Sequence, residues 1–104
     1  MDMVQAAREA LENAKESFPK APRIQRLMVE DEIDMEGRDA LRVTVVVPDD
    51  TRDDEFTGDN LLALDWAIHQ ALRAKGIRLF PYVFYATEQE LAEEAEERAR
   101  EAAT

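Results

Sequence analysis

Five apolar residues near the start of the chain are spaced by three or four positions: Val4, Ala7, Leu11, Ala14 and Phe18. This spacing follows the period of an α-helix and places the five side chains on one helix face. Pro19 comes next, and proline ends helices because it lacks a backbone N–H and its ring clashes with the preceding turn. The pattern predicts a first helix over residues 3–17.

Apolar and polar residues then alternate, which is the pattern of half-buried β-strands. In residues 41–47 the apolar positions of one parity are Leu41, Val43, Val45 and Val47. The preceding run has Leu27, Val29, Ile33 and Met35 in one parity, with Asp31 as the exception. The two runs predict a β-hairpin.

The register of this hairpin follows from matching the two apolar faces. Antiparallel partners on matched faces have residue numbers with an even sum, and we expect Val29 opposite Val45. Asp31 then faces Val43, so a bulge or a frayed edge is expected there, because a buried unpaired carboxylate is costly. Gly37 is expected to take a positive φ in a three-residue loop, 36–38.

A second helix is expected from about Asn60 to Lys75, with Asp59 as its N-cap and Gly76 at its end. A helical wheel divides its apolar residues into two stripes. The first stripe consists of Leu61, Leu64, Ile68, Ala71 and Leu72, and the second, at its flank, of Leu62, Trp66, His69 and Arg73. The first stripe predicts the core-facing side of this helix.

The last third of the chain predicts a strand and a helix. Residues 77–85 are apolar on both faces, and Pro81 makes this third strand either an edge strand or a bulged one. Thr87 and Glu90 have the spacing of a capping box, which begins a third helix. Beyond Leu91 the apolar residues of that helix are all alanine, so we expect residues 88–104 to bury little surface and to fray in part.

These elements predict a single α+β domain, residues 1–104, in the order helix, strand, strand, helix, strand, helix. We expect a two-layer fold with a three-stranded sheet and the first two helices on one of its faces.

The chain of 104 residues has 24 acidic and 13 basic side chains, giving a net charge of −11. Residues 30–39 and 49–59 each hold six acids against one base, and residues 88–101 hold seven against two. Each segment therefore carries −5, and the rest of the chain carries +4. A field of this sign repels phosphate, which argues against nucleic acids and anionic membranes as partners.

Composition also excludes several kinds of chemistry. Cysteine is absent, which excludes disulfides, thiolate metal sites and a cysteine nucleophile. The acidic start and the lack of an apolar run of about 18 residues indicate neither a signal peptide nor a membrane anchor, so we expect a cytoplasmic protein.

Candidate catalytic and metal-binding residues are few. His69 is the one histidine and Ser17 the one serine, so neither a zinc site nor a serine triad is expected. The acidic loop consists of Asp49, Asp50, Asp53, Asp54 and Glu55, interrupted by Thr51 and Arg52. Its spacing differs from that of an EF-hand, so we expect no cofactor and no specific metal, and we assign the loop to an acidic surface.

Aromatic residues indicate an interface. Phe80, Tyr82 and Phe84 share the face of the third strand that the first two helices leave free, and we expect a homodimer through this face or this strand. The stripe with Trp66, His69 and Arg73 is the second candidate contact, because Trp and Arg are frequent interface anchors. The alternative is that the third helix and the connectors cover both patches.

The stretch Gly37-Arg38-Asp39-Ala40-Leu41-Arg42, within this order of elements, resembles the minimal nucleotidyltransferase domain of bacterial toxin–antitoxin pairs. That family carries a Gly-Ser turn and two aspartates entering its second strand. Here Arg38 replaces the serine and only Asp39 matches an aspartate, so metal-dependent nucleotide transfer does not carry over. The same stretch, continued to Val47, also resembles a hairpin of small uncharacterised bacterial proteins.

The leading hypothesis is a non-enzymatic, partner-binding or regulatory protein of the bacterial cytoplasm, similar to an antitoxin or an adaptor. In this hypothesis the acidic surface binds a protein partner with a basic surface, and the aromatic sheet face forms a homodimer. One alternative is a degenerate nucleotidyltransferase-like enzyme that uses Mg²⁺ with Asp39 or the acidic loop. The other is an inhibitor whose carboxylates mimic the phosphates of a nucleic acid.

Overall fold

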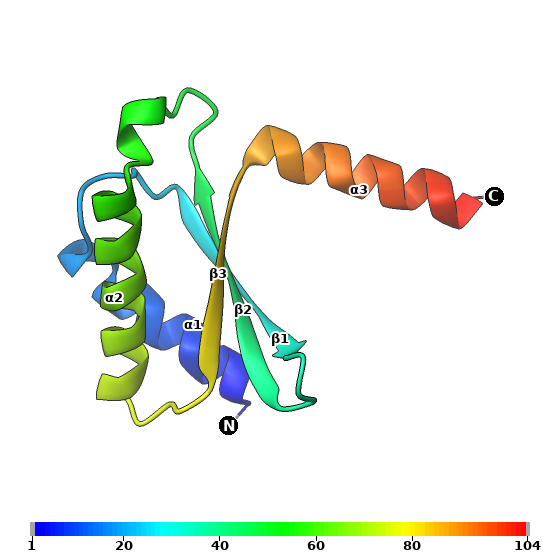
Figure 1. Ribbon diagram of the computed structural model, residues 1–104. Helices are drawn as coiled ribbons and strands as arrows, with labels where there is room; N and C mark the ends of the chain where they lie inside the picture. The colour runs from blue at the N-terminus through cyan, green and yellow to red at the C-terminus, as the bar shows by residue number, and fades with distance from the viewer. Residues whose placement is uncertain (1, 104) are drawn as a thin grey trace.

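The computed structural model describes residues 2–103 and has the expected order of elements (Figure 1). The helices are α1 (Met3–Ala14), α2 (Gly58–Ala74) and α3 (Glu88–Ala103), and the strands are β1 (Arg26–Ile33), β2 (Asp39–Val47) and β3 (Phe80–Thr87). Short 3₁₀ turns follow α1, at Lys15–Ser17, and precede α2, at Asp53–Glu55. The predicted α+β class and element order are therefore confirmed.

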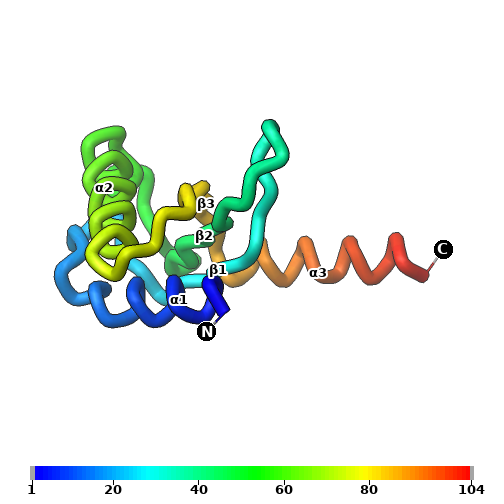
Figure 2. The backbone as a smooth tube through the Cα atoms, turned by 90° about the horizontal axis from the view of Figure 1, so that it is seen from below, coloured from blue at the N-terminus to red at the C-terminus, as the bar shows by residue number. Residues whose placement is uncertain are grey.

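The three strands form one sheet in the order β1-β2-β3, in which β1 and β2 are antiparallel and β2 and β3 are parallel. Helices α1 and α2 lie together on one face of this sheet, and α3 points away on the other side (Figures 1 and 2). The predicted two-layer arrangement is thus correct.

The core lies between the sheet and the two helices α1 and α2. The buried residues of β2 that face the helices are those of the predicted parity, Leu41, Val43, Val45 and Val47. From α2 the first stripe contributes Leu64, Ile68 and Leu72, and α1 contributes Ala7, Ala10 and Leu11. Periodicity therefore identified the core-facing sides of both helices.

The hairpin register differs from the expected one by two residues. Val29 pairs with Val43 rather than with Val45, and the pairing runs without a bulge along all of β1. Asp31 pairs with Leu41 and is exposed, because the helices do not cover this end of β1. The bulge or frayed edge expected near Asp31 is not formed, since the strand pairs without interruption and this carboxylate is already in solvent.

The turn of the hairpin spans residues 34–38 and depends on Gly37. The backbone N–H of Gly37 donates to the carbonyl of Asp34 at 3.0 Å, and Gly37 has a φ of 80°. The side chain of Asp34 accepts the backbone N–H groups of Glu36 and Arg38, both at 2.9 Å. These hydrogen bonds, that of Arg38 first, hold the pKa of Asp34 below its usual value.

Gly37→Ala is expected to lower the free energy of unfolding by about 1–2 kcal/mol, because a side chain disfavours the left-handed region. Gly58→Ala is the matched control: Gly58 is the first residue of α2, and open space surrounds the position of an added Cβ. Urea unfolding of both variants measures the difference. Equal stability of the two variants would show that the turn tolerates a side chain.

The caps of α2 differ from the expectation at one end. The side chain of Thr57, and not that of Asp59, accepts the backbone N–H of Asn60, at 3.2 Å, so the helix begins at Gly58. The other end is as expected, since Gly76 follows the helix with a φ of 73°.

Strand β3 begins at Phe80, later than predicted, and lies at the edge of the sheet. Its pairing with β2 is continuous through Pro81. Of the two alternatives for Pro81, an edge strand is therefore correct and a bulge is not.

Helix α3 follows β3 directly and begins with the predicted capping box. The hydroxyl of Thr87 accepts the N–H of Glu90 at 3.1 Å, and the carboxylate of Glu90 accepts the N–H of Thr87 at 3.0 Å. Two hydrogen bonds from Arg26 to Glu88, at 2.7 and 2.9 Å, join the first turn of α3 to β1 and lower the pKa of Glu88. The helix continues to Ala103 with residues 92–103 exposed, and fraying of its end stays a prediction.

None of the helices described between residues 2 and 103 has the length and apolar character required to cross a membrane.

Candidate interaction surface

No helix described between residues 2 and 103 lies on the side of the sheet opposite α1 and α2 (Figures 1 and 2). Helix α3 leaves the end of β3 on this side but stands away from the sheet (Figures 1 and 2). Phe80 of β3 is 54% exposed, and Tyr82 and Phe84 are also exposed. The alternative that the third helix covers these aromatic residues is therefore wrong.

Three aromatic rings, those of His69 on α2 and of Phe80 and Tyr82 on β3, contact one another in a row. The ring centroids of Phe80 and Tyr82 are 4.9 Å apart, and the His69 ring meets the Phe80 ring edge-on at 5.2 Å. Further along β3, the guanidinium of Arg42 lies 4.1 Å above the centre of the Phe84 ring. We call His69, Phe80, Tyr82 and Phe84 the aromatic strip.

Trp66 and Arg73 adjoin this strip on the flank of α2. They line a shallow hollow of about 250 Å³ together with Leu62, Asp65, His69 and Gln70. Trp66 is 65% exposed. Because His69 belongs to this hollow and also contacts Phe80, the two patches that the sequence offered as alternative contacts are parts of one surface.

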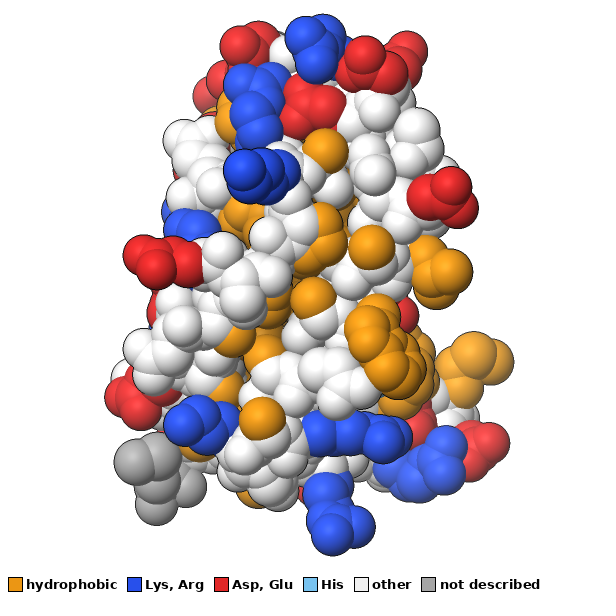
Figure 3. All heavy atoms as spheres, turned by 90° about the vertical axis from the view of Figure 1, so that its left-hand side faces the viewer, with side chains coloured by type: hydrophobic (Ala, Val, Ile, Leu, Met, Phe, Trp, Pro, Cys, Tyr) orange, Lys and Arg blue, Asp and Glu red, His pale blue; other side chains and the backbone are white. Residues whose placement is uncertain are grey.

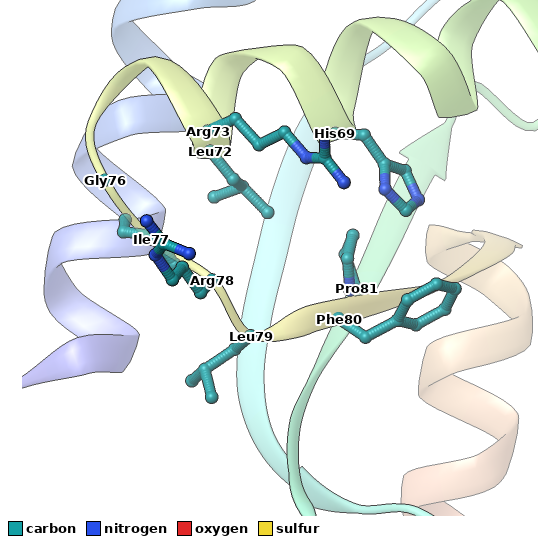
Figure 4. Close-up of a pocket in the computed structure, with 9 residues that line it drawn as sticks. All are labelled: His69, Leu72, Arg73, Gly76, Ile77, Arg78, Leu79, Phe80 and Pro81. Atoms are coloured by element: carbon teal, nitrogen blue, oxygen red, sulfur yellow. The ribbon is translucent and has the colours of Figure 1, made fainter.

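A second hollow, of about 480 Å³, lies where α2 ends and β3 begins (Figure 4). Its lining consists of His69, Leu72, Arg73, Gly76, Ile77, Arg78, Leu79, Phe80 and Pro81. The Arg73 and His69 side chains extend from α2 on the side that faces Phe80 (Figure 4). Two arginines and an aromatic ring therefore surround this hollow.

The end of α2 is positively charged although the chain is acidic. Residues 66–87 contain Arg73, Lys75 and Arg78 and no aspartate or glutamate. In the space-filling view a group of basic side chains gathers at the lower end of α2, next to hydrophobic groups (Figure 3). Sequence reasoning missed this cationic end, and the signal was the acid-free stretch of 22 residues from 66 to 87.

Within the acidic loop, Glu55 is not part of the surface. It is 5% exposed, and its carboxylate accepts hydrogen bonds from the Arg23 side chain at 2.9 and 3.0 Å. The backbone N–H groups of Arg23 and Arg52 donate to it as well, at 3.1 and 3.2 Å. These bonds, the Arg23 side chain first, lower the pKa of Glu55 to about 2. Glu55 therefore joins the loop to the segment before β1.

The four aspartates of this loop are exposed, but three of them form an ion pair or a hydrogen bond within the chain. Asp50 pairs with Arg23 at 3.2 Å, and Asp54 pairs with Arg52 at 3.1 Å. Asp49 accepts the backbone N–H of Gln89 in the first turn of α3, at 3.3 Å, and Asp53 is exposed. The loop is thus less free for a partner than its composition indicates.

The three acidic segments do not come together. The hairpin turn precedes β2 and the acidic loop follows it, so they lie at opposite ends of the sheet (Figure 1). The loop and the start of α3 are neighbours, as the bond between Asp49 and Gln89 indicates. The three acidic segments together therefore do not form one continuous row of carboxylates that could imitate the phosphates of a nucleic acid.

Catalytic and metal-binding groups are not gathered on this surface. His69 lies 3.6 Å from Asp65, one turn earlier on α2, and its ring contacts Phe80. Asp39 is at the start of β2, opposite Ile33. In the part of the chain that the structure describes, no group of three His, Asp or Glu residues is placed to hold a metal ion.

The surface consists of exposed aromatic rings with basic side chains at its α2 end. Comparisons of the chain with protein-family models, with curated proteins and with solved structures found no match.

Proposed function

We propose that the chain is a non-enzymatic protein-binding module whose aromatic strip, together with Trp66 and the cationic end of α2, binds an acidic and partly apolar protein segment. The observation that carries the proposal is the row of contacting rings of His69, Phe80 and Tyr82 beside Arg73 and Arg78 at the junction of α2 and β3. An antitoxin-like or adaptor-like regulatory role in a bacterial cytoplasm is part of this proposal.

Energetics support a binding role for these side chains. Large exposed apolar groups in one patch mark interaction sites on small domains, and Trp, Tyr and Arg contribute most to binding when they become buried. The basic side chains at the rim select an acidic partner and speed its association. In a chain of net charge −11, a cationic rim also favours one orientation of that partner.

The exposed glutamates of α3 favour a second binding surface, for a basic partner. This is the interaction that the acidic composition predicts.

The nucleotidyltransferase-like alternative stays a prediction. Calorimetry with Mg²⁺ and nucleoside triphosphates tests it, and no heat of binding is expected.

The proposed binding surface is tested by titrating the protein with a synthetic helical peptide of glutamate, alanine and leucine. Trp66 is the one tryptophan and reports binding by its fluorescence. We expect saturable binding that weakens with salt, and Phe80→Ala combined with Phe84→Ala is expected to raise the Kd at least about tenfold, a loss of about 1.4 kcal/mol.

Two controls sharpen this titration. Met3→Ala removes an exposed apolar side chain from α1, outside the proposed surface, and is expected to leave the Kd unchanged. A peptide with lysine in place of glutamate is expected not to bind. Equal binding of both peptides, or an unchanged Kd in the double variant, would contradict the proposal.

A further inference from the structure

We propose that the segment bound by this surface is helix α3 of a second copy of the chain, so that two copies exchange their C-terminal helices around a two-fold axis. This inference rests on the proposed function and names its partner. Three features of the structure lead to it: the position of α3, the pattern of its side chains and the distribution of charge.

Helix α3 stands away from its own domain on the side of the aromatic strip (Figures 1 and 2). It is held at its base by Arg26 and by the Asp49 side chain, which bind Glu88 and Gln89. Its 16 residues extend about 24 Å, whereas the strand from Phe80 to Phe84 rises about 13 Å. The helix is therefore long enough to cross the whole strip of another copy.

The side chains of α3 divide into an apolar side and a charged side. At about 100° per residue, one side of the helix is formed by Leu91, Ala92, Ala95, Ala99 and Ala102. From Ala92 onward this side is exposed in the single chain. Alanine lets a helix backbone approach large side chains closely, so this side fits a surface of protruding aromatic rings.

The charge of α3 is complementary to the α2 end of the strip, whereas the other end, at Tyr82 and Phe84, borders Glu32, Asp34 and Glu36 of the hairpin. Helix α3 holds seven glutamates against Arg98 and Arg100, whereas residues 66–87 hold three basic residues and no acid. On the wheel Glu94 and Arg98 lie at one edge of the apolar side, Glu96 lies at the other edge, where it pairs with Arg100 at 3.4 Å, and Glu93 and Glu97 lie opposite. A helix that docks by its apolar side therefore brings two acids, Glu94 and Glu96, and one base, Arg98, toward the basic rim.

In this structure one chain does not make this contact with itself, because α3 points away from its own sheet (Figures 1 and 2). Helix α3 begins where β3 ends, whereas Arg73 and Arg78 lie beyond the start of β3. A two-fold axis brings each helix to the other copy, and the contact is then made twice in a closed dimer.

Charge-reversal variants and their mixture test the exchange, with molar mass measured by sedimentation equilibrium. The full chain is expected to be a dimer. Arg73→Glu with Arg78→Glu, and separately Glu94→Lys with Glu96→Lys, are each expected to raise the dimer dissociation constant at least about tenfold. Mixing the two variants is expected to restore a dimer containing one of each, because every docked helix then meets a surface of opposite charge.

The matched control is Glu93→Lys with Glu97→Lys, which has the same change in net charge on the opposite side of α3 and is expected to dimerise like the unmodified chain. The inference is overturned by a monomer at high micromolar concentration and low salt, by equal effects of the two lysine pairs, or by failure of the mixture to associate. If the full chain is monomeric but the acidic peptide still binds at the strip, the proposed function stands and this inference fails.

Discussion

Leu64→Ala is expected to lower the free energy of unfolding by about 3 kcal/mol, whereas Leu62→Ala, two residues away on the same helix, is expected to change it by less than about 0.5 kcal/mol. Leu64 is fully buried between α2 and the sheet, and Leu62 is 70% exposed. The two substitutions remove the same atoms. Their difference therefore measures burial and the cavity left behind, and not helix propensity.

Urea unfolding followed by circular dichroism measures both variants, and equal m-values are expected because each variant exposes the same surface on unfolding. In a domain of this size, each kcal/mol of lost stability lowers the Tm by on the order of 4–8 °C. Leu64→Ala is therefore also expected to lower the Tm by more than about 10 °C. Similar losses for both leucines would mean that α2 does not pack on the sheet by its first stripe.

Glu55→Gln is expected to lower the Tm at neutral pH by on the order of 5–10 °C, and the difference from the unmodified chain is expected to disappear in acid. Gln retains the shape of Glu but loses the charge that receives four hydrogen bonds from Arg23 and Arg52. Charged hydrogen bonds are stronger than neutral ones, and of its two carboxylate partners the Arg23 side chain keeps only Asp50.

The pH range of this effect follows from the lowered pKa of Glu55. Folding lowers this pKa from an ordinary 4.5 to about 2, so the folded state favours the ionised form. The stability that Glu55 contributes is complete above about pH 4.5 and is lost as the pH falls toward about 2. Thermal unfolding of both proteins between these limits is therefore expected to give curves that converge.

Asp54→Asn is the matched control, because Asp54 pairs with Arg52 while both side chains are exposed and such pairs contribute little. It is expected to leave the Tm nearly unchanged at every pH. Asp34 and Glu88 also have lowered pKa values, so every variant loses stability in acid and only the difference reports on Glu55. Parallel curves for Glu55→Gln and the unmodified chain would contradict the assignment.

Local patterns predicted the parts of the fold that depend on neighbouring residues. The turn at Gly37, the capping box of Thr87 and Glu90 and the core-facing side of α2 each rest on groups within a few positions in the chain. The N-cap of α2 was missed by two residues. Thr57 and Asp59 are both suitable cap residues, and the choice between them depends on where the preceding 3₁₀ turn ends.

The hairpin register shows where such reasoning ends. Alternation requires an even sum for the paired residue numbers, and both Val29 with Val45 and Val29 with Val43 satisfy it. The structure has the second pairing, which leaves Asp31 at the end of the sheet that the helices do not cover. How far the helices extend over the sheet depends on the packing of the whole domain and cannot be inferred from the alternation within the strands.

The candidate surface was predicted in its parts but not as a whole. Trp66, His69 and Arg73 were placed on one patch, and Phe80, Tyr82 and Phe84 on another. His69 joins them because α2 crosses the sheet beside the edge strand. Glu55 was assigned to the acidic surface since its partner Arg23 is 32 positions earlier, a distance at which composition gives no indication of pairing.

The order of helices and strands, the faces they bury and the acidity of three segments follow from the amino-acid pattern, because period, capping and charge are local properties. The strand register, the burial of Glu55, the union of the two aromatic patches and the direction of α3 follow from tertiary packing. Each of these features depends on which segments, distant in the sequence, come into contact when the core forms. A local sequence pattern is compatible with several such contacts of similar free energy.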